Sequence, residues 1–180
     1  MPKVQKLFLT GYTGCGKTSL GRKVAQRLKV RFIDTDAEIE SREQASVSDI
    51  FRYEGEQHFR EAEHTILREL AADALPAIVS TGGGMPVWGD NAELLNEIGI
   101  TVYIRRSAAQ IARRLTPYGR AKRPRLRGLS DTEIVEFMER DIARREPFYA
   151  KARFTLDGDT SSDNELTDRL IEIYNNCNEQ

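Results

Sequence analysis

The sequence of 180 residues is 39% hydrophobic and 31% charged, a balance that excludes an intrinsically disordered chain. Its two cysteines, Cys15 and Cys177, are too few for a disulfide framework, so we expect a protein of the reducing cytoplasm. No apolar run is long enough to span a bilayer, and we expect neither a secretory leader nor a membrane partner. The formal net charge of −1 hides a basic segment, because nine positive charges and no carboxylate lie between Glu97 and Asp131.

Short apolar runs that alternate with amphipathic stretches predict a parallel sheet covered by helices. We expect strands at 7–9, 30–33, 77–79 and 101–104, and a weaker fifth strand at 154–156. Stripes of apolar residues predict helices over 20–28, 56–70 and 166–174, and a further helix from Ser107 that carries Arg113 and Arg114. This alternation gives βαβ units and a three-layer α/β fold, in which ligands bind beyond the carboxyl ends of the strands.

The residues that follow the first strand match the phosphate-loop pattern G-x-x-x-x-G-K-[ST], as Gly11-Tyr12-Thr13-Gly14-Cys15-Gly16-Lys17-Thr18. Successive backbone N–H groups of such a loop face an anion, and the following helix N-terminus adds a favourable dipole. Lys17 would reach the β- and γ-phosphates, and the Thr18 hydroxyl would bind Mg²⁺. The alternative is a glycine-rich turn before a helix. Cys15 is either a small filler or a reactive thiol. The predicted nucleotide-binding residues are Gly14, Cys15, Gly16, Lys17, Thr18 and Ser19.

Two carboxylates follow the second strand, which ends in Phe32-Ile33-Asp34-Thr35-Asp36. Because side chains alternate along a strand, we expect Asp34 and Asp36 to point to the same side at the ligand-binding edge. One carboxylate can then serve a Mg²⁺ ion while the other orients and deprotonates an attacking hydroxyl. The local alternative makes Asp34 a turn residue and Asp36 the N-cap of a helix.

The third strand is followed by Ser80-Thr81-Gly82-Gly83-Gly84, a stretch of bare backbone that a ligand can approach closely. The Asp-Glu pair typical of motor ATPases is absent there, and the sequence has no Asn-Lys-x-Asp guanine signature. These features favour phosphoryl transfer to a small acceptor over ATP-driven motion or a GTP switch.

The ordered combination of short motifs resembles the shikimate kinase family along nearly the whole length of the chain. The matching pieces are the phosphate loop, residues 32–36, Phe59-Arg60, Gly82-Gly83-Gly84, Arg123-Pro124 and Arg145-Glu146-Pro147-Phe148-Tyr149. The resemblance implies one P-loop kinase domain over residues 1–180, similar to nucleoside monophosphate kinases. It would have a five-stranded parallel sheet, a helical substrate-binding region near 34–61 and a mobile lid near 113–129.

The resemblance also implies ATP-dependent phosphorylation of the 3-hydroxyl of shikimate, in aromatic amino-acid biosynthesis, by a monomer. Asp36 would bind the acceptor hydroxyls and act as base, and Asp34 would join Thr18 at Mg²⁺. The other implied roles form three groups. The substrate carboxylate would be held by Arg60, Arg145, Gly82 and Gly83, adenine would stack on Arg114, and the ATP phosphates would meet Arg123 from the lid.

An arginine-rich flap suits closure over a polyanion, because closure excludes water that would hydrolyse ATP. Other interpretations of the basic segment are a solvated surface and a nucleic-acid patch. The chain has no DNA- or RNA-binding motif, so we expect no nucleic-acid partner. Two alternatives to a shikimate kinase stay open: a kinase for another small hydroxy acid such as gluconate, and a non-catalytic ATP-binding module.

Overall fold

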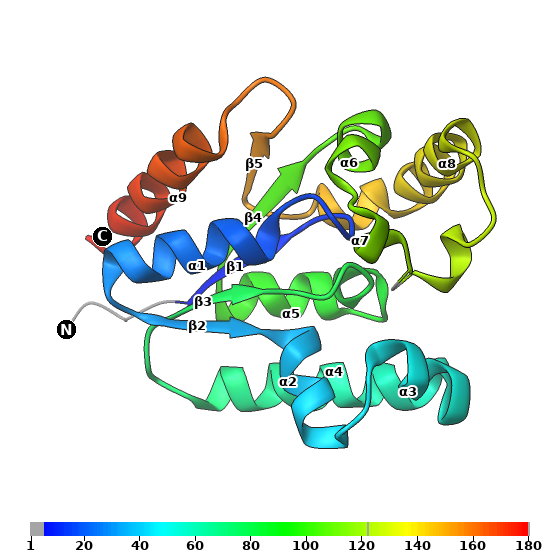
Figure 1. Ribbon diagram of the computed structural model, residues 1–180. Coiled ribbons are helices and arrows are strands. Elements are labelled where there is room, and N and C mark those ends of the chain that lie inside the picture. Colours follow the sequence, from blue (N-terminus) through cyan, green and yellow to red (C-terminus); the bar gives the residue numbers. More distant parts are fainter. Residues whose placement is uncertain (1–5, 122, 180) are drawn as a thin grey trace.

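The computed structural model describes residues 6–121 and 123–179, in which strands and helices alternate as expected (Figure 1). In chain order the elements are β1 (Lys6–Thr10), α1 (Lys17–Leu28), β2 (Arg31–Asp34), α2 (Thr35–Glu43), α3 (Val47–Tyr53), α4 (Gly55–Ala72), β3 (Ala77–Ser80), the 3-10 helix η1 (Met85–Val87), α5 (Asn91–Ile98), β4 (Gly99–Arg105), α6 (Ala108–Arg114), α7 (Pro117–Ala121), the 3-10 helix η2 (Pro124–Leu126), α8 (Asp131–Tyr149), β5 (Phe154–Asp157) and α9 (Asp163–Asn178).

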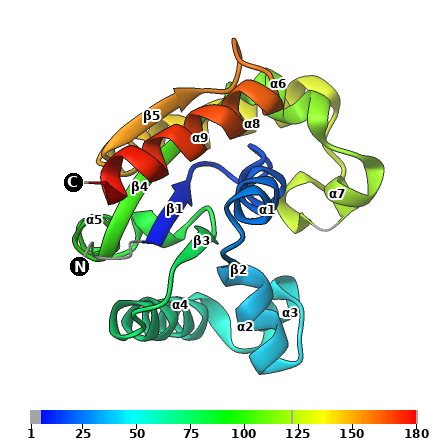
Figure 2. The same cartoon turned by 90° about the vertical axis from the view of Figure 1, so that its left-hand side faces the viewer.

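The five strands form one sheet in the order β2-β3-β1-β4-β5, and every neighbouring pair is parallel. Helices α1 and α9 cover one face of this sheet, and α4 and α5 cover the other (Figure 2). The predicted three-layer α/β architecture with a five-stranded parallel sheet is therefore confirmed. Among the described helices, none is long and apolar enough to cross a membrane.

The unbroken apolar runs are explained by burial on both faces of the sheet. Leu7 and Leu9 of β1 are fully buried in the cluster that also contains side chains of α1 and α9. Phe8, between them, is fully buried in the second cluster, with side chains of α2 to α5. The edge strand β2 differs, because its four residues are exposed or only half-buried. Helices therefore cover both faces of β1, as the predicted three-layer fold requires, whereas β2 at the edge is only partly covered.

The second strand ends two residues before Asp36, so it is shorter than the expected alternation of Asp34 and Asp36 requires. Strand β2 ends at Asp34, and α2 begins at Thr35, so Asp36 belongs to the first turn of a helix. Asp34 is the N-cap of this helix, and its Oδ1 accepts hydrogen bonds from Asp36 N at 3.1 Å and Ala37 N at 3.2 Å. The expectation that both aspartates point to one side of a strand is wrong, because capping of α2 replaces the pleat there.

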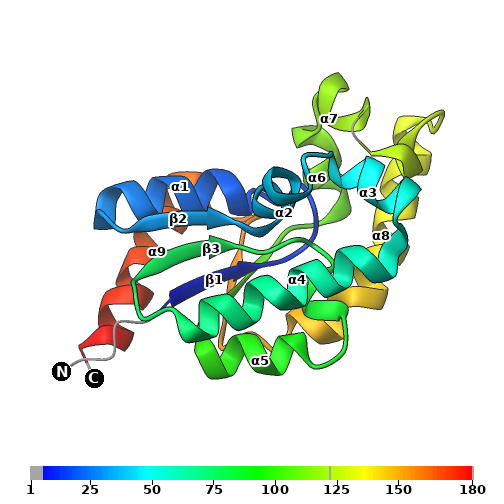
Figure 3. The same ribbon diagram turned by 90° about the horizontal axis from the view of Figure 1, so that it is seen from below.

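The basic segment contains more regular structure than its prolines and glycines suggest. Ser107 caps α6, as expected, and the following residues form α7 and η2. Figure 3 shows α7 projecting away from the sheet on the side of its carboxyl ends. Leu126, at the end of η2, is buried in the cluster under α1, so this end of the segment is attached to the main core. Lys122 lies outside the described residues.

Candidate active site

The phosphate loop connects β1 to α1 and takes its shape from three glycines. Gly11, Gly14 and Gly16 have φ values of 137°, 89° and 104°, a region that residues with a side chain rarely adopt. This backbone wraps around Lys17, which is buried and donates from Nζ to Gly11 O at 2.8 Å and Tyr12 O at 3.0 Å. The loop and the N-terminus of α1 together form an anion cradle with a cation inside it.

The other predicted loop residues lie on the same turn. Ser19 Oγ donates to Gly16 O at 3.0 Å, and the Cys15 thiol is fully buried, 3.8 Å from Lys17 Nζ. Burial of this kind fits the interpretation of Cys15 as a small filler rather than as an exposed nucleophile.

Three oxygen-bearing side chains meet beside this loop. Thr18 Oγ1 donates to Asp34 Oδ2 at 2.6 Å and lies 3.3 Å from Ser80 Oγ at the end of β3. The capping bonds to Asp34 Oδ1 fix the orientation of the carboxylate, which leaves Oδ2 facing Thr18. Hydroxyl and carboxylate oxygens are the ligands that Mg²⁺ prefers, so the donor set fits this ion.

Two carboxylates, each with one oxygen shielded from solvent, lie together next to the triple glycine. Asp36 Oδ1 and Glu63 Oε1 are shielded from solvent and have no hydrogen-bond partner among the described residues. A Cβ placed on Gly82 would lie 2.7 Å from Glu63 Oε1 and closer still to Asp36 Oδ1, so only glycine fits there. Burial, reinforced by Asp34, raises the pKa of Asp36 to about 6. Burial, opposed by Arg60, raises the pKa of Glu63 to about 7. Two such acceptors require hydroxyl or other polar donors from a ligand.

The two predicted carboxylate-binding arginines line one cavity of about 560 Å³. Arg60, on α4, is buried and held by Glu63 at 2.6 Å and Glu56 at 3.1 Å. Arg145, on α8, pairs with Asp141 at 3.1 Å. The full lining consists of Phe51, Glu56, Arg60, Gly84, Val87, Trp88, Arg125, Arg144, Arg145 and Phe148.

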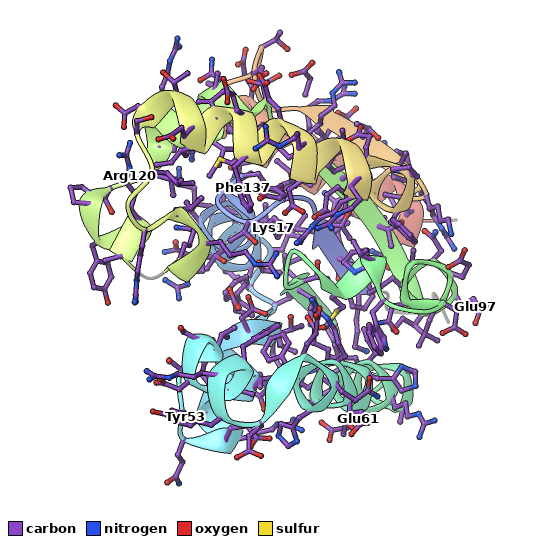
Figure 4. All side chains as sticks on the ribbon, turned by 90° about the vertical axis from the view of Figure 1, so that its right-hand side faces the viewer. Lys17, Tyr53, Glu61, Glu97, Arg120 and Phe137 are labelled. Carbon is purple, nitrogen blue, oxygen red and sulfur yellow. The ribbon has the colours of Figure 1, made fainter. Side chains whose placement is uncertain are left out.

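Asp36 does not line this cavity. It is connected to the cavity through Glu63, whose carboxylate binds Arg60. Gly83 also lies beside the cavity rather than in its wall, and its carbonyl accepts a hydrogen bond from Tyr149 Oη at 2.6 Å. The whole site lies at the carboxyl ends of the strands, where Figure 4 shows Lys17 between α8 and the helices α2 to α4.

Arg114 and Arg123 both reach the phosphate loop. Arg114 Nη2 lies 3.3 Å from the position that a Cβ on Gly16 would occupy, and it pairs with Asp163 at 3.2 Å. Arg123 Nη2 lies 3.5 Å from the corresponding position on Gly14. Its Nη1 donates to the carbonyl of Gly119 at 2.6 Å, and burial lowers its pKa. The structure thus brings the two predicted arginines to the same part of the loop, next to Gly14 and Gly16.

Arg106 was not predicted as a site residue, although it directly follows the fourth strand, where functional side chains were expected. Arg106 is buried, donates to Cys15 O at 2.8 Å and Gly158 O at 2.7 Å, and pairs with Asp163 at 2.8 Å. It therefore ties the phosphate loop to the turn after β5. Glu63 was missed as well, although its spacing of three residues from Arg60 on a helix was a usable signal.

Replacement of Arg106 by alanine should lower the free energy of unfolding by about 3 kcal/mol, because Cys15 O and Gly158 O lose a buried charged donor. Its neighbour Arg105 offers a matched control, since it makes an exposed ion pair with Asp157 at 2.9 Å. We expect little change for Arg105→Ala. Urea unfolding followed by circular dichroism compares the two variants, and equal effects would contradict the anchoring role of Arg106.

Fold and site together define a P-loop kinase for a small acceptor molecule. The family model described as shikimate kinase matches residues 13–175, and the chain belongs to this family. The shikimate kinase of Parabacteroides distasonis is 39% identical over 174 residues, which cover 94% of this chain and 99% of that protein.

Two solved structures agree with this assignment. The shikimate kinase of Bacteroides thetaiotaomicron is 35% identical, with a TM-score of 0.82 over 95% of this chain and 98% of that one. A structure of the Acinetobacter baumannii shikimate kinase in complex with shikimate is 29% identical, with a TM-score of 0.83 over 97% and 95%. The predicted resemblance is confirmed, and the family implies ATP as co-substrate and a place in aromatic biosynthesis.

Proposed function

We propose that the protein transfers the γ-phosphoryl group of ATP to the 3-hydroxyl of shikimate. The observation that carries this proposal is the placement of two arginines and two unpaired buried carboxylate oxygens beside one phosphate loop. Shikimate carries one carboxylate and three hydroxyl groups on a ring, so its two kinds of polar group correspond to the two kinds of partner that the site offers. Guanidinium forks match a planar carboxylate, and carboxylate oxygens accept from hydroxyls.

On the acceptor side, Arg60 and Arg145 bind the shikimate carboxylate, with the backbone of Gly82 and Gly83 beside it. Asp36 accepts from the reacting hydroxyl, orients it and takes its proton as the phosphoryl group transfers. A base with a pKa near 6 is ionised at neutral pH and still accepts a proton readily.

On the nucleotide side, the backbone of residues 11–18 binds the phosphates, and Lys17 moves from its two carbonyl partners to the β- and γ-oxygens. Arg123 adds positive charge over the phosphates, and Arg114 stacks on adenine. Thr18 and Asp34 are the residues that would hold Mg²⁺, and the ion would neutralise negative charge on the ATP phosphates.

We propose that residues 113–129 form a lid and that residues 34–61 form the acceptor-binding region of a single kinase domain. The short helices α7 and η2 lie in the lid, and the arginines at 114 and 123 contact the phosphate loop from it. Closure of this segment on ATP would exclude water from the reacting phosphate.

We also propose that the protein works as a cytoplasmic monomer without nucleic-acid or membrane partners. Cys15 and Cys177 are free thiols, which fits a reducing compartment. Light scattering at micromolar concentration should give the mass of a single chain, and a dimer would contradict this part of the proposal.

A coupled assay of ADP release over several acceptors tests the function directly. We expect ADP release with shikimate and none above background with gluconate or nucleoside monophosphates. Release with gluconate alone would assign the same site to another hydroxy acid. Tight ATP binding without turnover on any acceptor would identify a non-catalytic module.

Replacement of Arg60 by alanine should raise the KM for shikimate about a hundredfold and leave the KM for ATP nearly unchanged, because one half of the carboxylate clamp is lost. The alanine variant also leaves the buried Glu63 carboxylate without its arginine partner, which can destabilise the fold. Arg60→Lys is therefore tested as a second variant. Lysine keeps the charge but lacks the fork, and we expect about a tenfold rise. Steady-state kinetics with unchanged shikimate KM in both variants would refute the clamp.

A further inference from the structure

Asp141, which the proposed function does not use, is the buried partner of the cavity arginine Arg145. It lies four residues before Arg145 on α8, so both side chains are on one face of the helix. Its Oδ2 pairs with Arg145 Nη2 at 3.1 Å and accepts a hydrogen bond from Tyr12 Oη at 2.9 Å. Arg144 binds the other oxygen, Oδ1. Both oxygens of this carboxylate are therefore occupied by named donors.

Tyr12 belongs to the phosphate loop and contacts Arg145 in two ways. Its hydroxyl reaches Arg145 through Asp141, and its ring lies 5.5 Å from the guanidinium carbon of Arg145, within cation–π distance. The backbone carbonyl of the same residue accepts from Lys17 Nζ at 3.0 Å. One buried residue thus touches the phosphate-binding lysine at its backbone and the acceptor-binding arginine at its side chain.

Charge holds this arrangement together. Burial alone would raise the pKa of Asp141, but Arg145, the Tyr12 hydroxyl and Arg144 together hold that pKa below its ordinary value. Asp141 is thus an anion at neutral pH, fixed by three donors on two elements. Such an anion restricts the guanidinium of Arg145, which also interacts with the Tyr149 side chain, to one position in the wall of the cavity.

We propose that Tyr12 and Asp141 are positioning residues that aim Arg145 at the substrate carboxylate and thereby link the phosphate loop to the acid end of the acceptor site. The proposal deepens the proposed function and rests on it.

The direction of the effect separates positioning from simple electrostatics. Asp141→Asn removes a negative charge next to Arg145, which by Coulomb's law should make the site more attractive to a carboxylate. Loss of position has the opposite effect, since a guanidinium displaced by about 1 Å no longer meets both oxygens. A weaker interaction with shikimate in Asp141→Asn therefore requires a positioning role. Tyr12→Phe changes no charge and tests geometry alone.

The experiment compares these two variants of the full chain on shikimate and on its methyl ester, which lacks the negative charge. We expect the KM for shikimate to rise about tenfold in both variants while kcat changes less than about threefold. The KM for the ester should stay at the wild-type value, because the ester gains little from Arg145. An unchanged or lower shikimate KM in both variants would overturn the proposal, and so would an equal loss on both acceptors.

Tyr103→Phe is the matched control. Tyr103 is also a buried tyrosine that donates to a carboxylate of α8, Glu146 Oε2 at 2.6 Å, but that carboxylate is not the one that pairs with Arg145. The ring of Tyr103, which packs against Tyr149, is kept in phenylalanine. We expect wild-type KM values on both acceptors. A rise in the control equal to that in Tyr12→Phe would mean that any loosening of α8 has this effect, and the specific link would be refuted.

Calorimetry tests the connection to the phosphate loop. ADP should lower the dissociation constant of shikimate for the wild-type protein. The ratio of the dissociation constants without and with ADP should be smaller in Tyr12→Phe, because the shared residue no longer joins the two sites. An equal ratio in both proteins would overturn the link. A wild-type protein that releases no ADP with shikimate would refute the proposed function, whereas normal wild-type turnover with unaltered variants refutes only the positioning role.

Discussion

Replacement of Lys17 by alanine should lower kcat/KM for phosphoryl transfer at least about a thousandfold. Lys17 is the cation inside the loop, buried among the carbonyls of Gly11 and Tyr12, so no other described side chain can take its place. Its charge is needed most as negative charge moves onto the β–γ bridging oxygen in the transition state. The loss should therefore fall mainly on kcat, which ADP-release kinetics at saturating substrates measures.

A control on the same helix is Lys23→Ala, because Lys23 is exposed on α1. We expect activity within about twofold of wild type for this variant. Thermal unfolding of both variants shows whether Lys17→Ala still folds after its two loop carbonyls lose their donor. Activity of a folded Lys17→Ala protein within tenfold of wild type would contradict the phosphate-loop assignment.

The phosphate loop and the sheet could be predicted because their signals are local. Three glycines at fixed spacing have the positive φ values that the loop needs, and the apolar run at 7–9 is buried on both faces. The sequence carries these requirements within a few residues, so no tertiary information was necessary. The parallel order of the strands followed from the alternation with helices.

The turn after β2 was predicted with the correct residues but the wrong geometry. Asp36 was expected to continue the strand alternation, yet β2 ends at Asp34, whose side chain accepts from two backbone N–H groups and caps α2. Aspartate at a strand end has both options, because a side-chain cap competes with the extended pleat. The helical option also buries Ile39 of α2 in the core, a tertiary contact that the local sequence does not show.

Helix α8 was not predicted, although it carries Arg145. Pro147 interrupts the helical pattern within its last turn, where a proline normally signals a break. The capping box of Ser130 and Glu133 was the available signal for its start. Contacts such as Tyr12 with Asp141 join residues 129 positions apart and have no local signature at all.

Replacement of Asp36 by asparagine should lower kcat at least about a thousandfold, since an amide cannot take the proton of the reacting hydroxyl. Asparagine has nearly the same shape and still accepts through its amide oxygen, so shikimate should bind with a similar dissociation constant. Rapid-quench kinetics measures the transfer step, and calorimetry measures shikimate binding. A variant that keeps a tenth or more of the wild-type rate would remove Asp36 from the reaction.

The same variant should be more stable than the wild type at pH 8. A loss of activity in Asp36→Asn would then come from the lost chemistry and not from misfolding. Because the pKa of Asp36 is raised from 3.8 to about 6 in the folded protein, its neutral form stabilises the fold below about pH 4. This contribution is lost as the pH rises through 6, where the buried carboxylate becomes charged. Asparagine stays neutral, so the unfolding free energies should diverge from pH 4 to 8 by roughly 2–3 kcal/mol. Asp90→Asn serves as the control variant, because Asp90 is exposed. Urea unfolding at pH 4, 6 and 8 checks this, and a difference that shrinks with rising pH would contradict the burial of a charged Asp36.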